Sequence, residues 1–466
     1  MASVSGAIFF VLCRVVMRVT DRNHADIRQS VPHCVSDSSK NWRHNGMVRR
    51  NITLNQKSLS PIISSKLARR HLLVAGGIGL GLAFSRAARA VSRAIVQTGM
   101  HGDQGYESAG SFEIVAEFYG PGPSGIVVTD NGRIFVGFPR HAINHKGATL
   151  AELVNGHLVP WPSAALSMPS DAPPAERLLS IHGMTQDTRG FIWAIDDGKL
   201  AGLPLQPEAA KIVCFDPATN KLVRSIVLKS PTLLPDSHMN DLRVDLTHGA
   251  EGSVYVTDSS FGHSPALVVV DIATGQQKRV LGKHPSIQAE AGFMAVVEGL
   301  PLKYDPAQKP KFVTGGVDGI TLSPDSSRVF YSPLTSRRLY SLPTALLSDM
   351  SVSESNLAAA VKDEGEKGVA DGLATDAQGR IYTTNFEHDA IFRRNTDGSM
   401  ELMVHDPRVL SPDGIFCTQT HVYCTLGQWN RLAGFHDGKD ERQPPYLLIR
   451  FPIQGPPVSS AEPAGG

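Results

Sequence analysis

Six stretches of this chain share one pattern, a small or polar residue that leads into an apolar strand, a turn and a second apolar strand: SGIVVTDNGRIFVGF (124–138), HGMTQDTRGFIWAID (182–196), NDLRVDLTHGAEGSVYVTD (240–258), DGITLSPDSSRVFYSP (318–333), DGLATDAQGRIYTTN (371–385) and DGIFCTQTHVYCTL (413–426). Each copy is a small sheet that cannot bury both of its faces alone, so the copies must pack on one another around a common axis. The sequence therefore predicts an all-β fold, a six-bladed β-propeller of four-stranded blades.

Two isolated strands flank the repeats and indicate how the ring closes. FEIVAEFY (112–119) precedes the first copy, and LLIRFPI (447–453) follows the last. A ring without free sheet edges needs one blade completed by both chain ends, so we expect these two segments to share a blade. Two long insertions, 282–316 and 348–368, are predicted to form lids or rims, the second with a short helix at 355–362.

The composition is that of a globular protein with no bias toward nucleic acid. The 466 residues include 45 basic and 44 acidic side chains, and 41% of the residues are hydrophobic. The basic residues form no stripe and do not alternate with aromatic residues, which excludes a typical nucleic-acid surface. We therefore expect a monomer whose partner is a small-molecule ligand or substrate.

The cysteines are too few for a disulfide framework. If Thr420 and His421 form a two-residue turn, Cys417 and Cys424 face each other across a hairpin, either as a disulfide or as two buried thiols. Cys214, within IVCFD, is predicted to lie in the core.

The first ninety residues indicate export. Arg69-Arg70 is followed by a short apolar run (74–84) and by Ala88-Arg89-Ala90, which is typical of a twin-arginine signal cleaved after Ala90. The alternative is a membrane anchor, but the run is shorter than the ~20 residues that a span needs. We expect a periplasmic or secreted protein with no stable membrane span after signal removal.

The same features predict how the chain is divided. With Met47 as the expected start, the segments are a non-native or disordered extension (1–46), the signal sequence (47–90), a linker (91–111), the propeller (112–453) and a disordered tail (454–466).

The residues that open the repeats are the predicted functional positions. In a propeller the innermost strand of each blade runs along the central channel, so its first residue lies at one mouth. Those positions are Ser124, His182, Asn240 with Asp241, Asp318, Asp371 and Asp413. Converging carboxylates must be neutralised by protonation, by a cationic partner or by a metal. Oxygen-rich ligation suits Ca²⁺ or another divalent cation, with Asp318, Asp371 and Asn240 as the predicted ligands.

The same residues have an architectural interpretation. Asp-Gly before a strand is also a turn device, in which Asp bonds backbone amides and Gly takes φ > 0. For His182 the alternative is a hydrogen-bonded channel residue. Histidines in or near loops are most often solvated, and no zinc site is predicted from His141, His145, His238, His248 and His263.

Longer segments resemble bacterial members of the major royal jelly protein / Yellow family. These are VYVTDSSFGHSPALVVVDIATGQQKRVL (254–281), GGVDGITLSPDSSRVFYSPLTSRRLYSLPTALL (315–347), FPRHAINHKGATLAELVNGHLVPWP (138–162) and NDLRVD (240–245). The resemblance covers 112–453 and implies a secreted six-bladed propeller. Family members are associated with pigment chemistry of the dopachrome-tautomerase type and with binding small amines or lipids, and fold membership fixes none of these.

The opening positions resemble, more distantly, six-bladed lactonases of the gluconolactonase/senescence-marker type. Those enzymes hold a divalent metal through a Glu that opens blade one, an Asn-Gly and an Asp-Gly, with a further Asn-Asp-Gly that contacts substrate or metal. Here the four positions read Ser124, Asp318-Gly319, Asp371-Gly372 and Asn240-Asp241. The missing Glu removes a charged ligand, which Asp318 in place of Asn could restore.

Two functions stay open at this stage. In a binding protein, the channel mouth would hold a small polar or aromatic ligand against Phe261, Phe386 and Trp429, with five ligand-binding residues: Ser124, His182, Asn240, Asp241 and Asp413. In an enzyme, Asp371 or Asp318 would be the catalytic general base, for metal-dependent lactone hydrolysis or for a tautomerase-like proton transfer.

Overall fold

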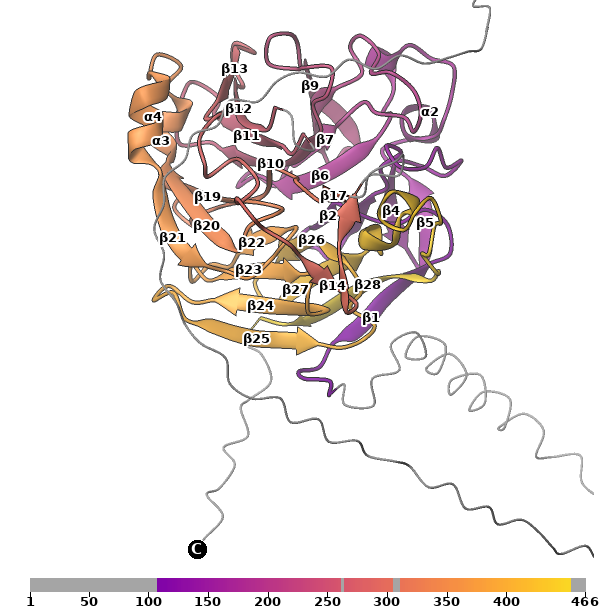
Figure 1. The fold of residues 1–466 in the computed structure, drawn as a ribbon. Coiled ribbons are helices and arrows are strands. Elements are labelled where there is room, and N and C mark those ends of the chain that lie inside the picture. The colour runs from indigo at the N-terminus through magenta and orange to yellow at the C-terminus, as the bar shows by residue number, and fades with distance from the viewer. Residues whose placement is uncertain (1–106, 261–263, 305–310, 454–466) are drawn as a thin grey trace, which may run out of the picture. The chain divides into compact units, whose positions relative to one another are not determined.

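The computed structural model describes residues 107–260, 264–304 and 311–453, and it confirms the six-bladed β-propeller (Figure 1). In five blades the strands follow one another from the channel outward, and every neighbouring pair is antiparallel. These blades are β2 (Ile126–Val128), β3 (Ile134–Gly137), β4 (Leu150–Val154), β5 (His157–Pro160); β6 (Ile181–Gln186), β7 (Ile192–Asp196), β8 (Lys211–Asp216), β9 (Lys221–Val227); β10 (Met239–Asp245), β11 (Ser253–Asp258), β12 (Ala266–Asp271), β13 (Gln277–Val280); β18 (Val317–Leu322), β19 (Arg328–Pro333), β20 (Arg338–Pro343), β21 (Lys362–Glu366); and β22 (Leu373–Thr375), β23 (Ile381–Asn385), β24 (Ala390–Arg394), β25 (Met400–His405).

The sixth blade closes the ring with both ends of the propeller. It consists of β26 (Pro412–Cys417), β27 (His421–Leu426), β28 (Tyr446–Pro452) and β1 (Glu113–Phe118). β1 is the outermost strand and pairs antiparallel with β28, with Phe118 opposite Tyr446. The predicted closure by terminal strands is therefore confirmed.

The hydrophobic core lies between adjacent blades. One cluster joins Trp193 and Ile212 of the second blade to Val254 and Val268 of the third. Inner and middle strands are almost wholly buried, whereas an outermost strand such as β9 is mostly exposed. Burial of apolar faces between blades holds the ring together, and it leaves the channel-facing starts of the inner strands free to carry polar groups.

The insertion after β13 forms two short hairpins, β14 (Val296–Val297) with β15 (Leu300–Pro301) and β16 (Lys303–Tyr304) with β17 (Lys311–Phe312). Leu302 packs in a cluster with Val369 and Phe386 from the fifth blade, and Phe435 packs against the same cluster. Because Phe435 also lines the cavity described below, the insertion supports the rim of the channel.

The described helices are all short: α2 (Ala164–Ser167), η1 (Pro174–Glu176), α3 (Thr344–Ser348), α4 (Glu354–Ala360), η2 (Trp429–Arg431) and η3 (Ala433–Phe435). α4 corresponds to the helix predicted at 355–362. It ends earlier than predicted because the chain must extend from Lys362 to pair with β20 as β21.

The cysteine prediction was wrong in register. Cys417 pairs with Val422 and Cys424 with Ile415, so the two thiols are not opposite each other. The two-residue turn is Gln419-Thr420 rather than Thr420-His421, because Thr418 N–H donates to the carbonyl of His421. Both cysteines are free thiols, and Cys214 is buried in the core as expected.

The predicted signal sequence and tail lie outside the described residues. Within the described part of the chain, no helix has both the length and the apolar character needed to cross a bilayer.

Candidate functional site

The predicted functional residues converge in the central channel. Seven of them line a small chamber of about 20 Å³, here called the hub chamber: Ser124, His182, Asn240, Asp241, Asp318, Asp371 and Asp413. Five of these, all except Ser124 and Asp241, also line a larger cavity of about 310 Å³, here called the mouth cavity. Asp318 and Asp371 therefore face the same end of the channel. The functional roles of these residues stay predictions.

Glycines after the opening residues allow neighbouring blades to approach closely. A Cβ atom at Gly319 would clash with the carbonyl oxygen of Asp371, one at Gly372 with that of Asp413, and one at Gly414 with that of Ser124. All three contacts would be closer than 3.0 Å, which real Cβ atoms essentially never show. None of these three glycines has a positive φ, so the interpretation of Asp-Gly as a turn device was wrong. Glycine is required here for close backbone approach.

Local irregularity in the inner strands aims the opening side chains. The pairing of β18 with β19 shifts between Val317 and Ile320, and that of β26 with β27 shifts between Pro412 and Ile415. Asp318 and Asp413 lie within these bulges. A bulge leaves residues outside the regular ladder and redirects their side chains, here into the channel.

The three converging carboxyl groups are harder to ionise than they would be in water, because their pKa values are raised. Burial raises the pKa of Asp318 to about 6 and the pKa of Asp413 to about 7. The pKa of Asp371 is raised well above its usual value, first by burial and then by the charges of Asp413 and Asp318. Near neutral pH the cluster therefore shares protons, as expected for like charges forced together.

A hydrogen-bonded chain orients two of the predicted metal ligands. Asn240 Nδ2 donates to Ser259 Oγ at 3.0 Å, and Ser259 Oγ donates to Asp318 Oδ2 at 2.9 Å. The hydroxyl of Ser259 thus links the third and fourth blades. Because the amide nitrogen of Asn240 is used as a donor, its carbonyl oxygen is the atom that suits a cation.

Asp241 is neutralised by a residue that the sequence reasoning missed. Arg243 Nη1 lies 2.9 Å from both carboxylate oxygens of Asp241, and Arg243 Nη2 donates to the carbonyl of Leu373 at 2.7 Å. Arg243 therefore reaches from the third blade to the fifth and borders the hub chamber. Its position two residues after Asp241 on one strand places both side chains on the same face, a signal that was available in the sequence.

One of the three predicted aromatic walls is confirmed. Trp429 lines the mouth cavity, beside Ile143, Leu432 and Phe435, which were not predicted. Phe386 is only 3% exposed and belongs to a core cluster, so its prediction as a wall was wrong. Phe261 lies outside the described residues. The unpredicted wall residues lie outside the six repeated stretches, in the connections between the second and third strands of the first and sixth blades.

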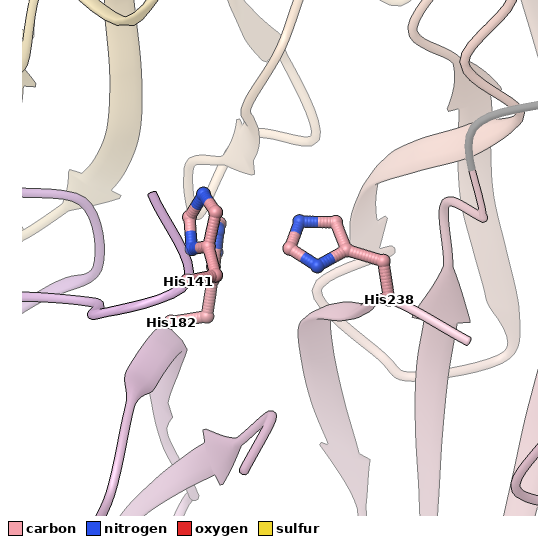
Figure 2. A group of neighbouring side chains, drawn as sticks. All are labelled: His141, His182 and His238. Atoms are coloured by element: carbon pink, nitrogen blue, oxygen red, sulfur yellow. The ribbon is translucent and has the colours of Figure 1, made fainter. Parts of the chain in front are cut away.

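Three histidines line the same cavity: His141, His182 and His238. Their ring centroids lie 4.9–5.1 Å apart, and Figure 2 shows the ring of His238 facing the stacked rings of the other two. His238 is only 6% exposed, so the expectation of a solvated loop histidine was wrong for it. His182 Nδ1 is hydrogen bonded to Ser124 Oγ at 3.3 Å, which confirms the channel-residue interpretation without excluding a ligand role.

Two other histidines of that set that the structure describes, His145 and His248, do not join the cluster. His145 Nε2 is hydrogen bonded to the carbonyl of Phe138, and His248 Nδ1 to the carboxylate of Asp245. His263 lies outside the described residues.

Comparison with protein families gives one match, the family model described as "Major royal jelly protein", over residues 179–416, just over half of the chain. No curated protein matches the sequence. The similar solved structures include virginiamycin B lyase from Staphylococcus aureus, with 13% identity, a TM-score of 0.41, and coverage of 73% of this chain and 99% of that one. They also include the calcium-binding protein regucalcin from Agrobacterium tumefaciens, with 15% identity, a TM-score of 0.41, and coverage of 74% of this chain and 94% of that one. A gluconolactonase from Xanthomonas campestris has 12% identity, a TM-score of 0.36, and coverage of 74% of this chain and 100% of that one.

Proposed function

The chain belongs to the major royal jelly protein family, and we propose that it is an exported protein that binds a small aromatic amine in the mouth cavity. One observation carries this proposal. Both buried carboxyl groups, from Asp318, Asp371 and Asp413, and apolar side chains, including Trp429 and Phe435, line this cavity, and Trp429 lies beside Asp413.

The carboxyl groups favour a cationic ligand. Their pKa values are raised chiefly because burial removes them from water, and the structure places three of them around one cavity. An ammonium group beside them would stabilise their ionised forms and would itself be stabilised. Pairing with the ammonium would relieve the cost of burying the negative charges, and this relief would add to the binding free energy.

The apolar lining residues favour an aromatic body on that ligand. Trp429 offers the ring that best attracts a cation or stacks on another ring, and Phe435 and Leu432 add apolar surface. A volume of about 310 Å³ is at the small end of ligand sites, which typically span about 300–1,000 Å³. We therefore expect a single-ring molecule rather than a lipid.

The same carboxyl groups would suit proton transfer on such a ligand. At neutral pH Asp318, with a pKa of about 6, would be mainly ionised, whereas burial and the neighbouring carboxylates raise the pKa of Asp371 and favour its protonated form. In a tautomerase-like reaction, Asp318 would accept a proton from carbon and Asp371 would donate one to oxygen, so the total number of protons is unchanged. This activity requires the proposed binding first.

Export is part of the proposal and has its own support. The paired Arg69-Arg70, the short apolar run and Ala88-Arg89-Ala90 are typical of a twin-arginine signal. We propose a periplasmic or secreted location, with cleavage after Ala90. N-terminal sequencing of the exported protein would contradict this if the chain still began upstream of Arg69.

A second candidate function is lactone hydrolysis with a divalent cation, and the donor set fits such a cation. Asp318, Asp371 and Asn240 offer two carboxylates and an amide carbonyl around the same cavity, a chemistry that suits Ca²⁺. The bound cation would polarise a lactone carbonyl and lower the pKa of a bound water. Asp371 or Asp318 would act as the general base.

Calorimetric titration of the full chain with tyramine, at a pH near 8 that lies above the pKa values of about 6 for Asp318 and about 7 for Asp413, tests the main proposal. We expect saturable binding that survives EDTA and weakens by about 10–100-fold in Asp371→Asn, because the variant lacks one of the carboxyl groups that would ionise beside the ammonium. Asp130→Asn, at an exposed hairpin turn, is the matched control and should bind like the wild type.

Equal binding by Asp371→Asn and the wild type would overturn the amine proposal. Ca²⁺ binding that is lost in Asp371→Asn, together with EDTA-sensitive hydrolysis of a simple aldonolactone, would favour the second candidate instead.

A further inference from the structure

The histidine cluster joins three separate parts of the chain. His141 lies in the loop between β3 and β4, His182 lies on β6, and His238 directly precedes β10. Each ring offers one ligand atom, and these atoms all lie within 4.8 Å of one another (Figure 2). All three side chains line the mouth cavity, so an ion could reach them from its interior.

The surroundings keep these rings neutral. Burial lowers the pKa of His141 to about 3, with smaller contributions from Lys199 and Arg442. Burial also lowers the pKa values of His182 and His238 well below their usual range. A neutral imidazole retains a nitrogen lone pair, which is the form that coordinates metals.

Oxygen atoms stand behind all three rings on the side of Nδ1. Ser124 Oγ lies 3.3 Å from His182 Nδ1, and Asp197 Oδ2 lies 3.5 Å from His238 Nδ1 and 3.9 Å from His141 Nδ1. In histidine metal sites an oxygen behind the ring typically accepts a hydrogen bond from the N–H of one nitrogen and thereby directs the other nitrogen to the ion. Here that arrangement would leave Nε2 of each ring for the cavity.

Two buried atoms in this arrangement have no hydrogen-bond partner among the residues that the structure describes. Asp197 is 1% exposed, and its Oδ1 accepts from Lys199 N–H at 2.8 Å, but its Oδ2 has no such partner within the described part of the chain. His141 Nδ1 is likewise buried without a partner. Leaving a buried carboxylate oxygen unsatisfied is costly, so the site is incomplete as it stands. Small rotations of His141 and His238 around a bound ion would satisfy both atoms.

We propose that His141, His182 and His238 bind a Zn²⁺ ion in the wall of the mouth cavity. Three neutral imidazoles suit zinc, whereas Ca²⁺ prefers oxygen ligands such as those of Asp318 and Asp371. Zinc–nitrogen bonds of about 2.0–2.1 Å require the three nitrogens to close slightly around the ion. Three protein ligands leave a fourth position, which would face the cavity and accept water or an oxygen of the ligand. The proposed amine binding does not need this ion, so the site adds a second chemistry to the cavity.

Zinc titration of the full chain, after chelator treatment and dialysis, tests the site by calorimetry. We expect one Zn²⁺ per chain. His141→Gln should weaken zinc binding by more than about 100-fold, because it removes one of the three ligands. The variant should still fold, since His141 lies in the loop between β3 and β4 rather than in a strand. Asp197→Asn should weaken binding by about 10–100-fold, as expected for the group that orients two ligands. His157→Gln, on the exposed strand β5, is the matched control and should leave the affinity unchanged.

Thermal unfolding of each variant checks that the fold is retained. If His141→Gln does not fold, Co²⁺ added to the wild-type protein decides, because nitrogen ligation in a tetrahedral site gives much stronger visible absorption than octahedral oxygen ligation. Weak, oxygen-type absorption, or zinc affinity that is equal in His141→Gln and the wild type, would overturn the zinc site. Tyramine binding in the same samples reports separately on the proposed function.

Discussion

Two sets of residues line the mouth cavity, called here its two sides, and they differ in how the chain builds them. The carboxylate side consists of Asp318, Asp371 and Asp413, which occupy the same position in three successive blades. The other side contains His141 and Trp429, which lie outside the repeated stretches, in the connections between the second and third strands of the first and sixth blades. The repeat therefore supplies charge at a position set by symmetry, and the irregular loops supply the groups that would distinguish one ligand from another.

The two sides also respond to pH in opposite directions. Burial raises the pKa of Asp413 to about 7, above the value of about 3.9 expected in the unfolded chain, so the contribution of Asp413 to stability is full below pH ~4 and is lost as pH rises through about 7. Burial lowers the pKa of His141 to about 3, below its unfolded value of about 6.5. The contribution of His141 is therefore full above pH ~6.5 and is lost as pH falls toward 3.

The largest effect is expected where the carboxylate side depends on backbone contact. In Gly414→Ala the new Cβ atom would clash with the carbonyl oxygen of Ser124, which belongs to the next blade of the ring. We expect the free energy of unfolding, measured by urea denaturation, to fall by more than about 3 kcal/mol. Gly120→Ala is the control, because nothing lies within 4 Å of a Cβ atom there. Equal stabilities of the two variants would show that the blades do not need this close approach.

A smaller effect is expected from removing one charge of the carboxylate side. Asp413→Asn removes the pKa difference described above. As pH rises from about 5 to about 8, the free energy of unfolding of this variant should therefore fall less than that of the wild type. His141→Gln should instead flatten the loss of stability below about pH 6. Urea denaturation across this range measures both. If the two variants follow the wild-type pH dependence, the opposition between the two sides is wrong.

A still smaller effect is expected from mutation of the aromatic wall. Trp429→Leu should weaken tyramine binding by about 5–10-fold, roughly 1 kcal/mol, and change stability little, because this ring faces the cavity. Phe386→Leu should do the reverse, since its ring is packed in the core. Calorimetry and thermal unfolding of both variants give the comparison. If Phe386→Leu lost tyramine affinity while it was fully folded, this assignment of Trp429 to the cavity and of Phe386 to the core would be contradicted.

The smallest effect is expected at the rim. Arg431 Nε donates to Glu298 Oε1 at 2.7 Å, which ties the insertion to the turn that carries Trp429. Glu298→Gln keeps the shape and weakens the charge, so we expect tyramine to dissociate about 2–3-fold faster with little change in stability. Stopped-flow measurement of tryptophan fluorescence would detect this. Unchanged dissociation would indicate that the insertion does not restrain the wall.

Sequence reasoning succeeded where residues recur and failed where contacts are unique. The opening residues of the inner strands were found because period and alternation place them at one channel mouth. The role of Gly319 and Gly414 was misjudged because close approach between blades is not visible within one strand. Cys417 and Cys424 were misplaced because a hairpin register depends on the backbone bonds of its turn. His238 was dismissed as a solvated loop residue although it is buried beside His141.

The amino-acid sequence by itself determined the propeller, its closure by β1 and β28, and the ring of polar residues at its centre. These follow from local periodicity and from the need to bury both faces of each sheet. The tertiary structure alone decided that three histidines meet beside Asp197, that Arg243 neutralises Asp241, and that Trp429 and Phe435 form one wall. Loop conformations and inter-blade contacts depend on the packing of the whole ring, so no local pattern encodes them.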